Sequence, residues 1–259
     1  MSWLGLQDRV VVVTGATGGI GRAMVSAFAG QGARVVLLDI DRAAAESAVA
    51  ELGGVLALAC DMGDPEAVAG AARQVERELG GADVLVNNAA ILRPGALEHL
   101  PVADWEAMLR INLTGYLLAA QEFGRAMLQR GEGALVHVAS IAGTQPQPQS
   151  GAYSPSKAAT LMLSRQLAQE WGPRGVRSNT VSPGLVMTPM SAAFYADAGV
   201  KSRREEMVPL RRIAGPEDMA DVALFLASRR ASYVSGQDIV VDGGLSQSLM
   251  GLVPRPGYA

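Results

Sequence analysis

The sequence has one cysteine, Cys60, and two histidines, His99 and His137, among its 259 residues. A single cysteine excludes an intrachain disulfide and favours a reducing, cytoplasmic compartment. So few thiolate and imidazole groups exclude a histidine- or cysteine-rich metal site, and we expect no metal. His137 lies within the apolar run 134–139, which indicates a packed strand residue rather than a ligand.

Strong net charge and long apolar runs are also lacking. The formal net charge is −3 and basic residues are scattered, so the sequence has no basic footprint for nucleic acid. Apolar runs such as residues 222–227 are too short to span a bilayer, and we expect no membrane partner. Because a strand-like run already begins at Val10, we expect no signal peptide ahead of the fold.

Short β-branched runs alternate with longer alanine-rich segments. The expected strands are residues 10–13, 35–38, 55–59, 84–86, 135–138, 178–181 and 239–241. Continuous apolar runs of this length are typical of parallel strands covered by helices on both faces. Asp64 and Pro65 have the pattern of an N-cap and a first helical residue, and Pro216 opens another helix similarly. The sequence therefore predicts one α/β domain over residues 1–259, with a doubly wound, mostly parallel seven-stranded sheet of the Rossmann type.

A glycine-rich turn follows the first expected strand. Residues 14–21 read TGATGGIG, so Gly15, Gly19 and Gly21 have a Gly-x-x-x-Gly-x-Gly spacing. Glycines there allow a close backbone approach, so that N–H groups at a helix N-terminus can face a pyrophosphate. Asp39 ends the second strand, where a carboxylate can accept hydrogen bonds from an adenosine ribose. Alone the spacing is only a glycine-rich turn, but with Asp39 it indicates a dinucleotide site.

Polar or small groups recur where later strands end. Asp61 and Met62 follow the third strand, and residues 87–90, which read NNAA, end the fourth. Asp64 suits helix capping better than Asp61 does, which leaves Asp61 for a ligand. Open α/β sheets bind ligands along this edge.

Tyr153 and Lys157 are four residues apart in a segment that becomes helical, so they share one face. A free tyrosine has a pKa near 10 and is a poor base at neutral pH. We expect the Lys157 ammonium, with a positively charged nicotinamide, to lower the pKa of Tyr153 toward working pH. Ser140 ends the fifth strand, from where its hydroxyl can hold a substrate oxygen. Alone, a Tyr-x-x-x-Lys pattern is typical of a surface pair.

Together these motifs resemble the short-chain dehydrogenase/reductase family from about Leu6 to Gly244. The shared motifs are Thr14-Gly15-x-x-x-Gly19-x-Gly21, Asn87-Asn88-Ala89, Asn112, Ser140, Tyr153-x-x-x-Lys157, Pro183-Gly184 and Asp242-Gly243-Gly244. The resemblance implies Tyr153 as general acid/base, Ser140 as the group orienting the substrate oxygen, and Lys157 as the group bonding the nicotinamide ribose. It also implies that Asn112 holds a water in a proton relay and that Thr188 meets the carboxamide.

The resemblance thus implies two sets of site residues. The catalytic set is Asn112, Ser140, Tyr153 and Lys157. The cofactor-binding set is Gly15, Thr17, Gly18, Gly19, Ile20, Gly21, Asp39, Ile40, Asp61, Met62, Asn88, Ala89, Ala90, Tyr153, Lys157, Pro183, Gly184, Val186 and Thr188. Two positions depart from the family pattern. Ala90 replaces a glycine, which matters little if its φ is negative. Pro155 is tolerable if the helix begins near Ser150, so that Pro155 lies in its first turn.

The expected activity is hydride transfer between NAD(H) and a secondary alcohol or ketone. Asp39 favours NAD(H), because its carboxylate repels the 2′-phosphate of NADP(H). Arg42 is near enough to meet that phosphate, but Asp41 offers it a competing partner. One alternative is a 3-oxoacyl-[acyl-carrier-protein] reductase with Arg130 and Arg174 toward an acidic carrier, although we interpret both as solvated helix ends. Others are a lyase or epimerase, and a dinucleotide-binding protein without redox activity.

Three further segments carry expectations. Residues 187–212 alternate without a clean period and are the expected substrate lid, whose apolar members are Met187, Met190, Phe194, Tyr195 and Met207. Arg93 is expected at the surface, with contact to an anionic substrate as the alternative.

Helices around 104–128 and 156–170 are apolar nearly all round, which predicts a homotetramer. The tail at about 245–259 either covers a neighbouring subunit's pocket or frays.

Overall fold

The computed structural model describes residues 3–253 and 257. A seven-stranded sheet with the order β3-β2-β1-β4-β5-β6-β7 forms its centre. The strands are β1 (Val10–Thr14), β2 (Arg34–Asp39), β3 (Leu56–Ala59), β4 (Val84–Asn87), β5 (Gly133–Val138), β6 (Val176–Pro183) and β7 (Asp238–Val241). All neighbouring pairs run parallel, which confirms the predicted doubly wound α/β fold. The chain reverses its winding between β1 and β4, and such a reversal opens a crevice at the carboxyl ends of the strands.

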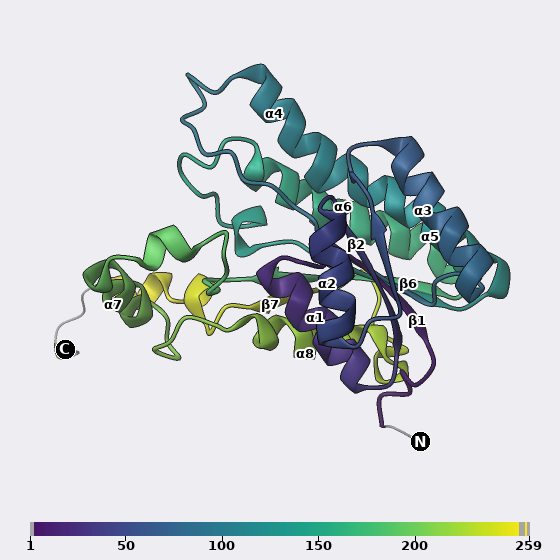
Figure 1. Ribbon diagram of the computed structural model, residues 1–259. Helices are drawn as coiled ribbons and strands as arrows, with labels where there is room; N and C mark the ends of the chain where they lie inside the picture. The colour runs from purple at the N-terminus through teal and green to yellow at the C-terminus, as the bar shows by residue number, and fades with distance from the viewer. Residues whose placement is uncertain (1–2, 254–256, 258–259) are drawn as a thin grey trace.

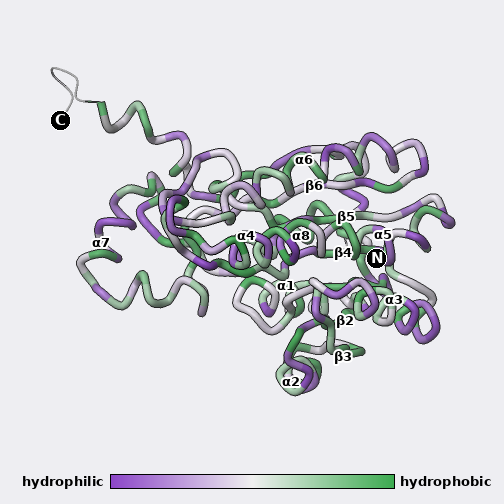
Figure 2. Tube along the Cα trace, turned by 90° about the horizontal axis from the view of Figure 1, so that it is seen from above, coloured by the Kyte–Doolittle hydropathy of each residue, from purple (hydrophilic) through white to green (hydrophobic). Residues whose placement is uncertain are grey.

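Helices cover both faces of this sheet (Figure 1). One layer consists of α1 (Gly19–Gly30), α2 (Arg42–Leu52) and α8 (Pro216–Ala227), and the other of α3 (Pro65–Leu79), α5 (Gly115–Arg130) and α6 (Tyr153–Trp171). Val11 and Val13 of β1 belong to the first core, whereas Val10 and Val12 belong to the second. Both faces of the strand are therefore buried, which explains its uninterrupted apolar run and the apolar centre seen in Figure 2.

The expected helix starts agree with the structure in two of three cases. Asp64 caps α3, since its side chain accepts a hydrogen bond from the Glu66 N–H at 2.9 Å, and Pro65 is the first helical residue. Pro216 likewise begins α8. Helix α6 begins at Tyr153 rather than near Ser150. Pro155 is still in the first turn, where its missing N–H has no partner to lose.

Residues 104–128, expected as one helix, contain an interruption. Helix α4 (Val102–Leu109) runs into a π-helical turn (Arg110–Thr114), which leads directly into α5. The turn carries Asn112, which is fully buried. Single π-helical turns inside longer helices are frequent at functional sites because the widened turn redirects side chains.

The expected lid forms a loop whose two ends are adjacent. It contains a 3₁₀ turn (Ala192–Tyr195) and α7 (Ala198–Met207), which projects from the layered body in Figure 1. The Met187 N–H donates to the Ala214 oxygen, and the Ala214 N–H donates to the Leu185 oxygen, each at 2.9 Å. These two bonds close the base of the loop.

The described part of the C-terminal tail forms two 3₁₀ turns, Leu245–Gln247 and Leu249–Leu252, on the side of α7. Residues 254–256 and 258–259 of the expected tail lie outside the described residues. Over residues 3–253, no helix is long and apolar enough to cross a membrane. The same part of the chain holds no group of three or more side chains able to bind a metal ion.

Candidate active site

A cavity of about 850 Å³ opens beside the carboxyl ends of the strands. It is lined by the expected cofactor-binding and catalytic residues apart from Gly21 and Asn112. The cavity joins the glycine turn and Asp39 at one end to Ser140, Tyr153 and Lys157 at the other. Its size and shape fit an extended ligand such as a dinucleotide together with a small substrate.

The glycine turn is fixed from the neighbouring strand β4. The Thr14 hydroxyl accepts hydrogen bonds from the N–H groups of Asn88 at 2.9 Å and Ala89 at 3.0 Å. The Asn88 amide donates to the carbonyl oxygens of Thr14 and Gly15, both at 3.0 Å. A Cβ added at Gly21 would lie 2.2 Å from the Gly15 oxygen. Gly21 therefore shapes the turn from behind instead of lining the cavity.

Asp39 is placed at the nucleotide end by Thr17 of the glycine turn. Its Oδ2 accepts from the Thr17 N–H at 3.0 Å and from the Thr17 hydroxyl at 2.7 Å. Arg42 pairs with Glu46 at 2.8 Å, one helical turn further along α2. The expected pairing of Arg42 with Asp41 was wrong, because the Asp41 side chain instead caps α2 by accepting a hydrogen bond from the Ala44 N–H. Arg42 thus has an acidic partner on its own helix.

The strand end that carries Ser140 lies directly against helix α6. Ser140 follows β5 by two residues and caps a 3₁₀ turn (Ile141–Gly143), accepting from the Ala142 N–H at 3.1 Å. A Cβ on Gly143 would lie 2.9 Å from the backbone of Lys157, so glycine permits this close approach. The Ser140 side chain thereby forms a hydrogen bond with Tyr153. The serine, tyrosine and lysine of the expected catalytic set thus lie together.

Burial shifts the pKa values of both Tyr153 and Lys157. Enclosure raises the pKa of Tyr153, and the hydrogen bond from Ser140 offsets this only in part. Lys157 is 1% exposed, and burial lowers its pKa to about 7. Desolvation therefore dominates both pKa values in the protein by itself, and the expectation that Lys157 and a bound nicotinamide together lower the pKa of Tyr153 stays a prediction. The positive charge of a nicotinamide ring beside Tyr153 would oppose this desolvation.

The Asn112 side chain links the loop after β4 to helix α6. Its Oδ1 accepts from the Ile91 N–H and its Nδ2 donates to the Ile91 oxygen, both at 2.9 Å. The Nδ2 also donates to the Ser156 hydroxyl at 3.2 Å. The side chain is thus committed to holding the loop after β4 against α6, and the implied water relay stays a prediction.

The end of the cavity near Ser140 and the expected lid is partly polar, which the sequence did not predict. Of the apolar lid residues, Met190, Phe194, Tyr195 and Met207 line the cavity, whereas Met187 does not. Gln145, Gln147 and Arg204 also line it. The Arg204 guanidinium lies 5.1 Å from the Phe194 ring centroid and 5.3 Å from that of Tyr195. The glutamines belong to the QPQPQ run after Ser140, whose prolines indicate an extended path past the site.

The departures from the family pattern are accommodated. Ala90 is not among the non-glycine residues with positive φ, which over the described residues are Asp8, Gln149 and Arg211.

Arg93 is exposed and pairs with Asp104 at 2.6 Å, as the surface interpretation predicts.

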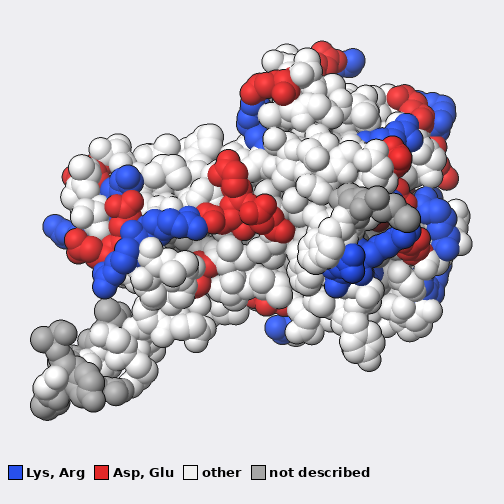
Figure 3. All heavy atoms as spheres, turned by 90° about the horizontal axis from the view of Figure 1, so that it is seen from below, with Lys and Arg blue, Asp and Glu red and all other residues white. Residues whose placement is uncertain are grey.

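The two arginines considered for an acidic carrier differ in their surroundings. Arg130 donates to the carbonyl oxygens of Gly80 and Ala82 and lies 3.4 Å from Asp83. Arg174 ends a short 3₁₀ turn and is exposed. Figure 3 shows basic and acidic side chains intermixed on the face that it presents, without a continuous basic area. The interpretation of Arg130 as a helix-end residue agrees with these contacts.

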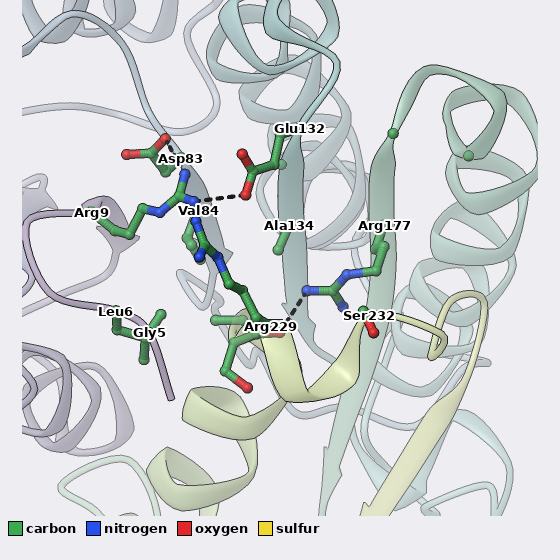
Figure 4. A pocket seen from close by; sticks show the side chains of 15 residues that line it. Gly5, Leu6, Arg9, Asp83, Val84, Glu132, Ala134, Arg177, Arg229 and Ser232 are labelled. Carbon is green, nitrogen blue, oxygen red and sulfur yellow. Dashed lines mark hydrogen bonds and ion pairs between the residues drawn. The ribbon is translucent and has the colours of Figure 1, made fainter. Parts of the chain in front are cut away.

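A second cavity, of about 290 Å³, includes residues at the opposite, amino-terminal edge of the sheet (Figure 4). Arg9 pairs there with Glu132 at 2.7 Å and with Asp83 at 3.2 Å. Arg177 donates to the oxygens of Leu226 at 2.8 Å and Ser228 at 3.2 Å, at the end of α8. Because these guanidinium groups already have partners, the cavity is best understood as a junction that anchors α8 to the sheet.

Comparisons with known proteins agree with this geometry. The profile of a family described as "Enoyl-(Acyl carrier protein) reductase" matches residues 15–246. The chain is 41% identical to D-threitol dehydrogenase of Mycolicibacterium smegmatis, over 92% of this chain and 93% of that protein. It is 40% identical to galactitol 2-dehydrogenase (L-tagatose-forming) of Cereibacter sphaeroides, over 92% and 95% of the two chains. A solved structure described as an NAD(P)-dependent gluconate 5-dehydrogenase from Beutenbergia cavernae, with NADP bound at low occupancy, superposes with a TM-score of 0.88 at 38% identity, covering 95% of this chain and 99% of the other.

Proposed function

Because the chain belongs to the short-chain dehydrogenase/reductase family and is an oxidoreductase of secondary alcohols and ketones, we propose that it prefers NAD(H) and uses Tyr153 as its general acid/base. One observation carries the proposal: a single cavity joins the Asp39 carboxylate to the group of Ser140, Tyr153 and Lys157. The glycine turn supplies the close backbone approach that a pyrophosphate needs, so the residues present fit such a cofactor.

The site residues divide the work as follows. The glycine turn and Asp39 would hold a nicotinamide dinucleotide, which would supply or accept the hydride. In reduction, the Tyr153 hydroxyl gives its proton to the substrate oxygen, and in oxidation it takes that proton back. Ser140 holds the same oxygen by a hydrogen bond. The Lys157 ammonium, when charged, stabilises the phenolate form of Tyr153.

The preferred substrate class is an alcohol with additional hydroxyl groups. The amides of Gln145 and Gln147 offer both donors and acceptors at the substrate end. Two of the similar proteins are named for threitol and galactitol. The carrier-linked 3-oxoacyl alternative receives less support, since the Arg130 guanidinium is engaged within the chain.

The test is Tyr153→Phe, assayed for NADH absorbance with a panel of polyols, simple secondary alcohols and ketones. We expect turnover to fall at least ~100-fold, because positioned proton transfer is lost, while NADH binding followed by fluorescence stays near wild type. Tyr233→Phe is the matched control, since Tyr233 is fully exposed at 103%. Retention of more than about a tenth of the wild-type rate would exclude Tyr153 as the acid/base.

We also propose a homotetramer in a reducing, cytoplasmic setting. Met108, Tyr116, Leu161 and Leu167 are buried in the chain's own core, so the free apolar face is smaller than the sequence predicted. Leu117 on α5 and Met162 on α6 still expose 36% and 58% of their surface. Light scattering at micromolar concentration tests the assembly, and a stable monomer would contradict it.

A further inference from the structure

The side chain of Lys157 is held by two oxygen atoms beneath the site. Its Nζ donates to the Val138 carbonyl oxygen at 2.7 Å and to the Tyr116 hydroxyl at 3.3 Å. Among the described residues it has no carboxylate within salt-bridge distance. A fully buried ammonium therefore depends on neutral oxygens for its stability.

Tyr116 is suited to this task because its hydroxyl is already oriented. It is fully buried at the start of α5, directly after the π-helical turn that carries Asn112. Its hydroxyl donates to the Val138 oxygen at 3.2 Å. With the proton committed there, the oxygen lone pairs face the Lys157 ammonium. The ring centroid lies 5.2 Å from Nζ, so the ring face adds an attraction of its own.

The ring of Tyr116 is held in turn by His137. The two rings stack with centroids 6.0 Å apart and an interplanar angle of 26°. The His137 imidazole lies between the Asn87 amide and the Ser178 hydroxyl, each at 3.1 Å. Burial and the nearby Lys157 lower the pKa of His137 to about 3, so the ring is neutral at physiological pH. The titratable groups that face Lys157 are thus Tyr153 on α6, Tyr116 on α5 and His137 on β5.

We propose that Tyr116 is a positioning residue, whose hydroxyl together with the Val138 carbonyl holds Lys157 as an ammonium beside Tyr153. The inference rests on the proposed function, in which a charged Lys157 supports the phenolate of Tyr153. It goes further by assigning the stability of that charge to a tyrosine outside the catalytic cavity. A tyrosine that only filled the core would not need its hydroxyl.

The experiment compares the pH dependence of alcohol oxidation in wild type and Tyr116→Phe. The phenylalanine keeps the ring stacked on His137 but removes the oxygen that accepts from Lys157. Without it the ammonium is less stable and gives Tyr153 less support, so the pH at which kcat/KM rises should move upward by about one unit. Below that pH the variant should be about tenfold slower. NADH binding and the unfolding temperature serve as checks of the fold.

Ser228→Ala is the matched control, because it also removes a buried hydroxyl, one that donates to the Phe225 oxygen at 2.7 Å at the end of α8 and not to Tyr116, His137 or Lys157. Its profile should superpose on that of wild type. Tyr116→Met, which lacks both ring and hydroxyl, should shift the profile in the same direction and replaces the phenylalanine variant if that one fails to fold.

Two results would overturn the inference: an unshifted profile in folded Tyr116→Phe, or an equal shift in Ser228→Ala. If Tyr153→Phe were active, the proposed function itself would fail. An inactive Tyr153→Phe with an unshifted Tyr116→Phe would reject the positioning role alone.

Discussion

Replacement of Asp39 should change the cofactor preference, and the structure sets the size of the effect. The carboxylate is half-buried and held toward the glycine turn by Thr17. At a separation on the order of 5 Å, a carboxylate and a phosphate charge would repel by ~1 kcal/mol in water and ~3 kcal/mol at an effective dielectric constant near 20. A half-buried site lies between these limits. We therefore expect wild type to favour NAD(H) by roughly 5- to 150-fold in kcat/KM from this charge.

Two variants separate the charge from the contacts. Asp39→Asn keeps an oxygen that can accept from Thr17 but removes the charge, whereas Asp39→Ala removes both. If repulsion decides the preference, both should shift the kcat/KM ratio toward NADP(H) by ~1–3 kcal/mol. Glu46→Ala is a useful companion, since it releases Arg42, which can then turn toward a phosphate. Steady-state kinetics with both cofactors are the assay. A wild-type enzyme with the higher kcat/KM for NADP(H), or an Asp39→Asn variant with an unchanged ratio, would refute the reasoning.

Three further outcomes follow from the packing. Gly21→Ala should weaken NADH binding and lower the free energy of unfolding by ~1–3 kcal/mol, because the new Cβ meets the Gly15 oxygen at 2.2 Å. Fluorescence titration and thermal unfolding measure the two effects, and an unchanged affinity would contradict this role of Gly21. Arg177→Met should cost about 1–3 kcal/mol in urea unfolding, since it removes bonds to carbonyl groups at the end of α8, whereas Arg229→Met should change stability by less than ~0.5 kcal/mol. Equal effects of the two would show that Arg177 is no anchor. Deletion of residues 251–259 tests whether the tail contributes to a neighbouring subunit's pocket: the KM for substrate should rise, and an unchanged KM would contradict that contribution.

The strands and the nucleotide end were predictable because their signals are local. Val10 to Val13 are all apolar because both faces of β1 are buried, and that pattern is visible in the sequence. Asp64 and Pro65 mark a helix start by their own chemistry. The role of Asp39 was predictable because this residue ends the second strand, whose position the apolar run indicates. In each case one segment contains the information.

The rest depends on contacts between distant segments. The upward direction of the Tyr153 pKa in the protein by itself could not be predicted, because a spacing of four residues says nothing about desolvation, which is set by the elements enclosing α6. The contact of Tyr116 with Lys157 crosses 41 positions and follows a π-helical turn that no periodicity indicates. Gln147 and Arg204 come from segments without regular patterns, so only the folded chain shows that they line one cavity.

The bonds between Leu185, Met187 and Ala214 have a consequence for engineering. They bring the two ends of the substrate-facing loop together, so residues 189–213, which leave Thr188 in place, can be treated as an exchangeable cassette. A transplanted loop must match this base, the Leu210 N–H bond to the Gly243 oxygen at 3.2 Å and the ion pair of Arg212 with Asp218. The glycine turn and Asp39 lie on other strands and would stay as they are. Chimaeras that carry the corresponding loop of a galactitol or threitol dehydrogenase would therefore change the substrate repertoire of the chain without redesign of its nucleotide half.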